Sequence, residues 1–95
     1  MVRRHHFHLD HLGHSITVNI RAGVHRDIEV LVDGHEVDHE RVRGNGLSVL
    51  TAELPDDPAQ PFQIRVHQPR FGSSVPQCVL SLGDVDRTMP ARLVV

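Results

Sequence analysis

The chain contains no tryptophan, tyrosine or lysine, only three phenylalanines and a single cysteine, Cys78. One cysteine cannot form a disulfide within the chain, which fits a reducing compartment. With few aromatic rings, scattered arginines and a net charge of −2, a nucleic-acid partner is disfavoured. No run approaches the roughly 20 apolar residues that span a bilayer, and no signal-peptide pattern follows the N-terminal arginines. We therefore expect a single domain over residues 1–95, soluble and cytoplasmic, without membrane contact.

The apolar residues, mostly Val, Leu and Ile, alternate with polar ones, and no window shows the spacing of a helix. This period of two predicts strands over residues 4–10, 14–21, 27–32, 35–42, 47–54, 62–67 and 77–82, and a short one over 85–89. Turns are expected at 12–13, 22–23, 33–34, 44–46 and 83–84, and loops at 55–61 and 69–74. Asp33-Gly34 is the strongest hairpin signal, because a type I′ turn needs positive φ at both central positions.

Seven to eight short strands with turns between them predict an all-β fold. The expected architecture is a small antiparallel β-sandwich, or one sheet curled into a small barrel. A histidine-rich N-terminal strand over residues 4–11 belongs to this single domain. Its outward side chains are His6, His8 and Asp10, while Phe7 and Leu9 face the core.

Residues 14–90 also resemble one domain of the Fas apoptotic inhibitory molecule family. The resemblance depends on a strand that ends in Val32-Asp33-Gly34, on the segment 78–84 with the sequence Cys-Val-Leu-Ser-Leu-Gly-Asp, and on a short strand reaching Met89-Pro90. It implies a compact antiparallel β-sandwich and a non-enzymatic interaction module.

A second pattern lies at the N-terminus, where residues 6–13 spell HxHxDHxG. This resembles the metal-binding signature of the metallo-β-lactamase superfamily, which would carry His6, His8, Asp10 and His11 over as zinc ligands and make zinc-bound hydroxide the nucleophile. In that superfamily a helix follows the motif and the domain is much longer. Here a strand pattern follows Gly13, so we regard a small metal-dependent hydrolase as the least favoured interpretation.

Metal binding of another kind remains open. On a strand, His6 and His8 point the same way about 6.6 Å apart, so their imidazoles can converge on one Zn, Ni or Cu ion. Asp10 could join or orient them, and His11 or His14 could complete the ligand set from the turn. The alternative is that these residues form the solvated face of a strand whose other face is buried.

The remaining candidate residues are weaker indications of a functional site. Cys78 lies on an apolar face and is expected to be a small buried hydrophobe rather than a nucleophile. His35 and His39 share a strand face and could form a minor second metal site. We identify no catalytic residues, because no convergent acid–base pair can be assembled from the strand faces. No cofactor is assigned, apart from zinc or another divalent metal at the N-terminal histidines.

The favoured interpretation is a non-enzymatic binding module whose partner is another protein or a second copy of itself. A short sandwich must protect its edge strands, and pairing with a second copy is one way to do so. A homodimer joined through the N-terminal histidine strand is the expected assembly. The main alternative is a transition-metal binding protein.

Overall fold

The computed structural model describes residues 3–43, 46–68 and 75–92, and these form strands, turns and short connections without a helix. No helix capable of crossing a membrane occurs in these segments. The nine strands are β1 (Arg3–His11), β2 (His14–Ala22), β3 (His25–Val32), β4 (His35–Arg43), β5 (Gly46–Leu54), β6 (Gln60–Gln68), β7 (Gln77–Leu82), β8 (Val85–Thr88) and β9 (Ala91–Arg92). The expected all-β class is confirmed.

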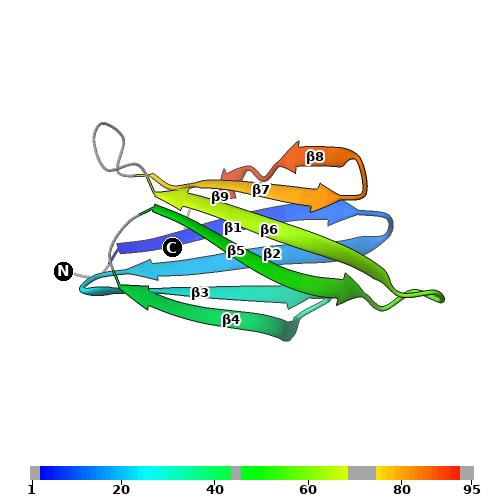
Figure 1. Cartoon of the computed structure of the whole chain (residues 1–95), viewed down its shortest axis with the longest axis horizontal. Coiled ribbons are helices and arrows are strands. Elements are labelled where there is room, and N and C mark those ends of the chain that lie inside the picture. Colours follow the sequence, from blue (N-terminus) through cyan, green and yellow to red (C-terminus); the bar gives the residue numbers. More distant parts are fainter. Residues whose placement is uncertain (1–2, 44–45, 69–74, 93–95) are drawn as a thin grey trace.

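The strands form two antiparallel sheets packed face to face (Figure 1), so the fold is a sandwich and not a single curled sheet. The five-stranded sheet has the order β4-β3-β2-β1-β9, and the four-stranded sheet has the order β5-β6-β7-β8. Consecutive strands pair as a meander within each sheet. The chain crosses between sheets after β4 and again after β8, where β9 returns to pair with β1.

Strict alternation of side chains produces the core. Phe7 and Leu9 of β1 are buried, as predicted, and His6 and His8, which alternate with them, lie on the other face. The strands β2, β3, β5, β6 and β7 contribute inward aliphatic residues in the same way. The core between the sheets consists of Phe7, Leu9, Ile16, Val18, Ile20, Ile28, Val30, Val32, Leu50, Leu54, Phe62, Ile64, Val66, Cys78, Leu80 and Met89.

Two tight turns set the registers around the histidine-rich strand. Asp33 and Gly34 both have positive φ, at 52° and 84°, as the type I′ prediction requires. Leu12 and Gly13 adopt the same left-handed region, at 53° and 79°. The two-residue β1–β2 turn places His11 opposite His14 and brings Asp10 opposite Ser15.

Some details differ from the sequence-based expectations. Pro61 was expected in a loop, but it lies in β6 opposite Glu53. It is tolerated because β7 pairs with β6 only from Gln63 onward, so the missing N–H falls where one side of β6 is open. The two-residue strand β9 was not predicted, since Ala91–Arg92 is too short to show a period. The predicted loop 69–74, and residues 44–45 of the predicted turn 44–46, lie outside the described residues.

One buried cation joins the two sheets. Strand β3 begins at His25, two residues earlier than predicted, and this places Arg26 on the inward face, where it is 3 % exposed. Its guanidinium donates to the Ser48 hydroxyl and, over 3.2 Å, to the Gly46 carbonyl, both on β5. We call this contact the arginine bridge. Burial lowers the pKa of Arg26, partly offset by the nearby Glu40 carboxylate.

Candidate functional site

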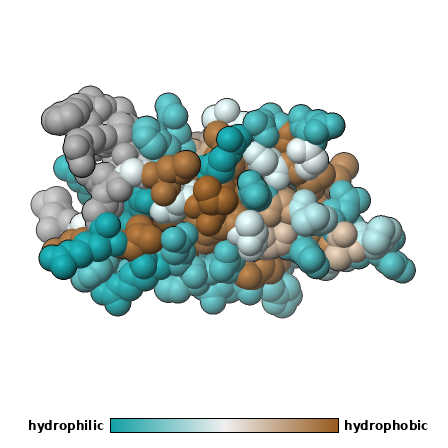
Figure 2. All heavy atoms as spheres, in the orientation of Figure 1, coloured by the Kyte–Doolittle hydropathy of each residue, from teal (hydrophilic) through white to brown (hydrophobic). Residues whose placement is uncertain are grey.

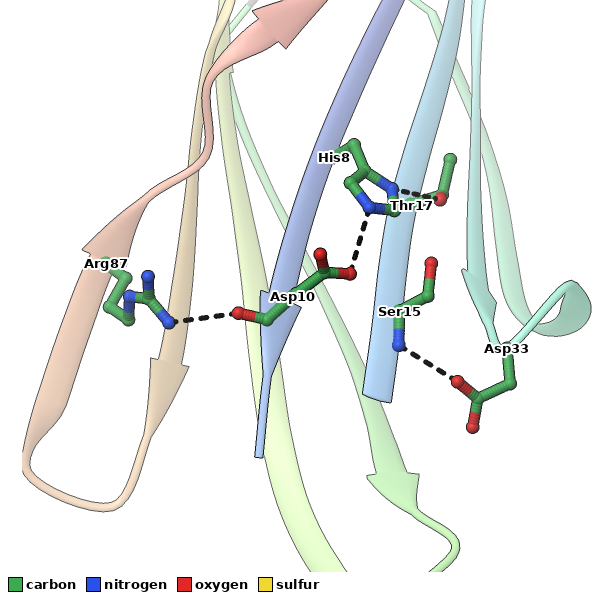
Figure 3. A network of polar contacts seen from close by, with 6 residues as sticks. All are labelled: His8, Asp10, Ser15, Thr17, Asp33 and Arg87. Atoms are coloured by element: carbon green, nitrogen blue, oxygen red, sulfur yellow. Dashed lines mark hydrogen bonds and ion pairs between the residues drawn. The ribbon is translucent and has the colours of Figure 1, made fainter. Parts of the chain in front are cut away.

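The β1–β2 hairpin places His11 and His14 opposite each other at one end of the sandwich, and this end lies at the right of Figure 1. The β1–β2 turn, the β3–β4 turn and the β5–β6 loop all lie at this end. Polar side chains from β1, β2 and β8 meet there, and Figure 3 shows part of their network.

The His8 imidazole contacts one residue of β2 and one residue of its own strand. Its Nδ1 lies 3.2 Å from the Thr17 hydroxyl and its Nε2 lies 3.1 Å from an Asp10 carboxylate oxygen (Figure 3). Because an ionised carboxylate can only accept, Nε2 carries the proton. Two of the predicted metal ligands, His8 and Asp10, are therefore in contact.

His6 points to the same face but pairs with a different residue. Asn19 donates its Nδ2 to Glu29 over 3.2 Å, so its Oδ1 faces His6 at 2.6 Å. The His6 Nδ1 must therefore carry the proton. In the neutral ring Nε2 keeps its lone pair, and within the described residues no group hydrogen-bonds to it.

His11 is held by a cation from the other sheet. Arg87 of β8 donates to the His11 Nδ1 over 2.9 Å and to the Asp10 carbonyl over 3.2 Å. An arginine has no acceptor, so the His11 Nδ1 is unprotonated and its lone pair is already used. The contact with Asp10 is visible in Figure 3. His11 thus joins β1 to β8.

His14 forms the closest polar contact between the two sheets at this end. Its Nδ1 lies 2.7 Å from Asp33 in the β3–β4 turn, and its Nε2 lies 2.7 Å from Asp56 in the β5–β6 loop. Asp33 also accepts the Ser15 backbone N–H at 2.9 Å. We call this three-residue contact the histidine bridge.

The histidine bridge favours a charged imidazole. Two ionised carboxylates can both be satisfied only when both ring nitrogens carry protons. The hydrogen bonds to Asp33 and Asp56 accordingly raise the pKa of His14 above its ordinary value. The Ser15 N–H and His14 together lower the pKa of Asp33.

The five predicted metal ligands therefore separate into local partnerships. His8 contacts Asp10, but His6 is bound to Asn19, His11 to Arg87, and His14 to two aspartates. No group of three or more His, Cys, Asp or Glu side chains is arranged to hold a metal ion in the part of the chain that the structure describes. His39 lies 3.6 Å from Asp27 and His35 lies beside Asp33. Metal binding stays a prediction that requires rearrangement of these contacts.

Sequence reasoning missed the partners that come from distant segments. Asp33, Asp56 and Arg87 were assigned to a turn, a solvated loop and a short strand, and Asp56 is 42 residues from His14. Only the sheet arrangement brings them together. Cys78 is buried, as predicted, and burial raises its pKa to about 12, so it is not a thiolate nucleophile at neutral pH.

A second candidate surface is the free edge of the four-stranded sheet. Strand β5 pairs only with β6 among the described strands, which leaves its other edge without a ladder. Only one of its nine residues, Glu53, is ionisable. Leu47 is 63 % exposed and Val49 is 45 % exposed on its outer face. Figure 2 shows apolar side chains gathered over this face of the sandwich.

The corresponding edge of the five-stranded sheet is built differently. Seven of the nine β4 residues are ionisable, and the register shift opposite Val30 and Leu31 leaves Val37 as an extra, unpaired position. Charges and bulges are the features that keep edge strands from pairing with other chains. The β4 edge is protected in this way and the β5 edge is not.

The N-terminal strand, where a dimer was expected, is partly covered. β9 pairs with β1 at His6 and Phe7, and the His8 N–H donates to the Pro90 carbonyl at 3.3 Å. Farther along β1, Arg87 donates a hydrogen bond to the Asp10 carbonyl. Less of the β1 backbone edge is therefore open to a second copy than of the β5 edge.

In comparisons with known proteins, no family model, curated protein or solved structure matches the chain.

Proposed function

We propose that this protein is a non-enzymatic binding module that associates by strand addition at β5, with a second copy of itself as the partner. The observation that carries the proposal is the nine-residue β5 edge, which has one ionisable residue and, among the described strands, no ladder on its outer side. Unpaired backbone N–H and C=O groups on such an edge are a template for another strand.

Charge makes a second copy a suitable partner. In an antiparallel β5–β5 pair centred on Leu50, the two Glu53 carboxylates lie about 20 Å apart along the ladder. That separation exceeds the screening length of roughly 8–10 Å in physiological salt. In the same pair the exposed Val49 of each copy lies directly opposite Thr51 of the other, and cross-strand pairs of β-branched residues are favourable. A closed twofold dimer results.

The test uses sedimentation velocity of the full chain over a wide concentration range, with one lysine placed on either edge of the four-stranded sheet. Val49→Lys charges the centre of the β5 edge, and Val85→Lys makes the same substitution on β8 at the opposite edge. The two valines are similarly exposed, at 45 % and 52 %. We expect the wild type and V85K to dimerise and V49K to remain monomeric.

A wild-type chain that is monomeric at millimolar concentration would exclude self-association. Equal loss of dimer in V49K and V85K would instead assign the effect to general charge repulsion. A dimer lost only in V85K, or on removal of β9, would place the interface on the other side of the sandwich.

A second candidate, transition-metal binding at the N-terminal histidines, is favoured by the free Nε2 lone pair of His6. The neighbouring His8 could join it after releasing Asp10. Metal analysis of protein purified without an affinity column tests this, with His6→Gln as the variant. Stoichiometric metal that H6Q loses supports the site, and a thermal midpoint that does not respond to chelator in metal-loaded protein contradicts it.

A further inference from the structure

The outer face of the five-stranded sheet carries a groove on the side away from the core. Three adjacent hollows of about 250, 310 and 360 Å³ share Arg21 as a lining residue. The largest of them is also lined by Arg4, His6, Asn19 and Glu29. Arg21 thus stands at the centre of the groove.

Two guanidinium groups lie together in this groove. Arg4 of β1 is directly opposite Arg21 of β2 in the ladder, so both side chains emerge on the same face, with Cβ atoms about 5 Å apart. Both are exposed, and neither has a hydrogen-bond or ion-pair partner among the described residues. Like charges directly opposite on a sheet are unfavourable unless something neutralises them.

The carboxylate nearest to Arg21 in its own cross-strand row already has partners. Asp27 is opposite Arg21 on the other side, but its carboxylate lies within 3.6 Å of His39 and 3.8 Å of Arg41. Glu29, which also lines the largest hollow, accepts the neutral Asn19 amide over 3.2 Å and keeps its negative charge, but it lies in the neighbouring cross-strand row with Asn19. The row Arg4, Arg21, Asp27 and Arg41 therefore contains three cations and one anion, and the excess positive charge is at Arg4 and Arg21.

We propose that Arg4 and Arg21 form an oxyanion site that binds the phosphoryl group of a small ligand. Guanidinium groups donate paired N–H bonds whose geometry matches phosphate oxygens. The hollow of about 360 Å³ is large enough for a phosphoryl group and part of the molecule that carries it. Such a ligand would neutralise the arginine pair. The site lies on the opposite sheet from β5 and is independent of the proposed dimer.

The experiment is a titration of ¹⁵N-labelled full-length protein with inorganic phosphate, followed by NMR at constant ionic strength. Saturable shifts confined to Arg4, Asn19 and Arg21 are expected. Arg21→Gln should weaken binding about tenfold through loss of charge-assisted hydrogen bonds. Arg43→Gln is the matched control, because Arg43 is exposed on β4 and lines none of the three hollows; it should change the affinity less than twofold.

Three results would overturn the proposal. The first is the absence of saturation at phosphate concentrations up to about 20 mM. The second is equal weakening in R21Q and R43Q, which would indicate only the net charge of the protein. The third is that citrate binds as well as phosphate at equal charge, which would remove the preference for a phosphoryl group. Retained amide dispersion in both variants shows that any loss of binding is not unfolding.

Discussion

The arginine bridge and the histidine bridge both join the sheets of this sandwich, and they differ in burial, in charge and in the chemistry of their partners. The arginine bridge runs from Arg26 on β3 to the start of β5 and is buried. The histidine bridge runs from His14 on β2 to Asp56 in the β5–β6 loop, and its carboxylates are 43 % and 33 % exposed. One is a permanent cation held by neutral oxygens. The other is a titrating group held between two carboxylates.

The difference shows how burial decides what a polar contact does. A buried guanidinium has no water to replace a lost partner, so breaking its contacts leaves groups unsatisfied and costs stability at every pH. The carboxylates of the histidine bridge are accessible to water and can exchange His14 for it, so the contribution of this bridge is smaller and depends on the charge of the imidazole. The arginine bridge should therefore act as a structural element, and the histidine bridge as a pH-dependent one.

Removing the arginine bridge is expected to have the larger effect. Arg26→Ala deletes the buried stem and leaves the Ser48 hydroxyl and the Gly46 carbonyl without their donor. We expect a loss of about 2–4 kcal/mol in the free energy of unfolding. Urea denaturation followed by circular dichroism at neutral pH measures it, and the loss should be the same at pH 5 and pH 8.

Ser48→Ala is the control for this comparison, because it removes one acceptor and keeps the arginine in place. It should cost about 1 kcal/mol. A loss in R26A no greater than that in S48A would show that the guanidinium and its stem contribute little, and that the two sheets are held by the aliphatic core alone.

The strands and the main hairpin could be predicted from the sequence because they depend on local chemistry. Alternation located every long strand, and Asp33-Gly34 identified its turn from the φ angles that it requires. The beginning of β6 was missed because a proline was taken to exclude pairing, whereas Pro61 pairs where one side of the strand is open. Arg26 was missed as a core residue because the predicted strand began at residue 27 and so left this charged residue outside it.

The candidate site was less predictable for a different reason. The histidine motif placed His6, His8 and Asp10 on one face, and this is confirmed by the alternation on β1, where these three are half-buried or exposed and the residues between them are buried. Their partners Asn19, Thr17 and Arg87 depend on which strands lie side by side, and local patterns do not specify this. The contacts of His14 with Asp33 and Asp56 could not be predicted for the same reason, because these residues are far apart in the sequence.

The pH dependence of the histidine bridge is the smallest of the expected effects. It is also the property that distinguishes this bridge most clearly from the arginine bridge. The pKa of His14 is raised above 6.5, so its stabilisation is complete below that pH and is lost as the pH rises through the folded-state value. The pKa of Asp33 is lowered below 3.8, so its stabilisation is present above that pH and is lost as the pH falls through its folded-state value. The bridge therefore contributes most between about pH 4 and 6.5.

His14→Gln isolates this contribution from that of the other histidines. The difference in unfolding free energy between the wild type and H14Q should be larger at pH 5 than at pH 8, because only the imidazolium donates to both carboxylates. Asp56→Asn should reduce the same difference, since it removes the carboxylate that holds Nε2. NMR titration of the His14 ring provides the direct check. A difference that is constant between pH 5 and pH 8, or a measured His14 pKa below 6.5, would make His14 a neutral surface contact and leave Arg26 as the only energetically significant polar bridge of the two.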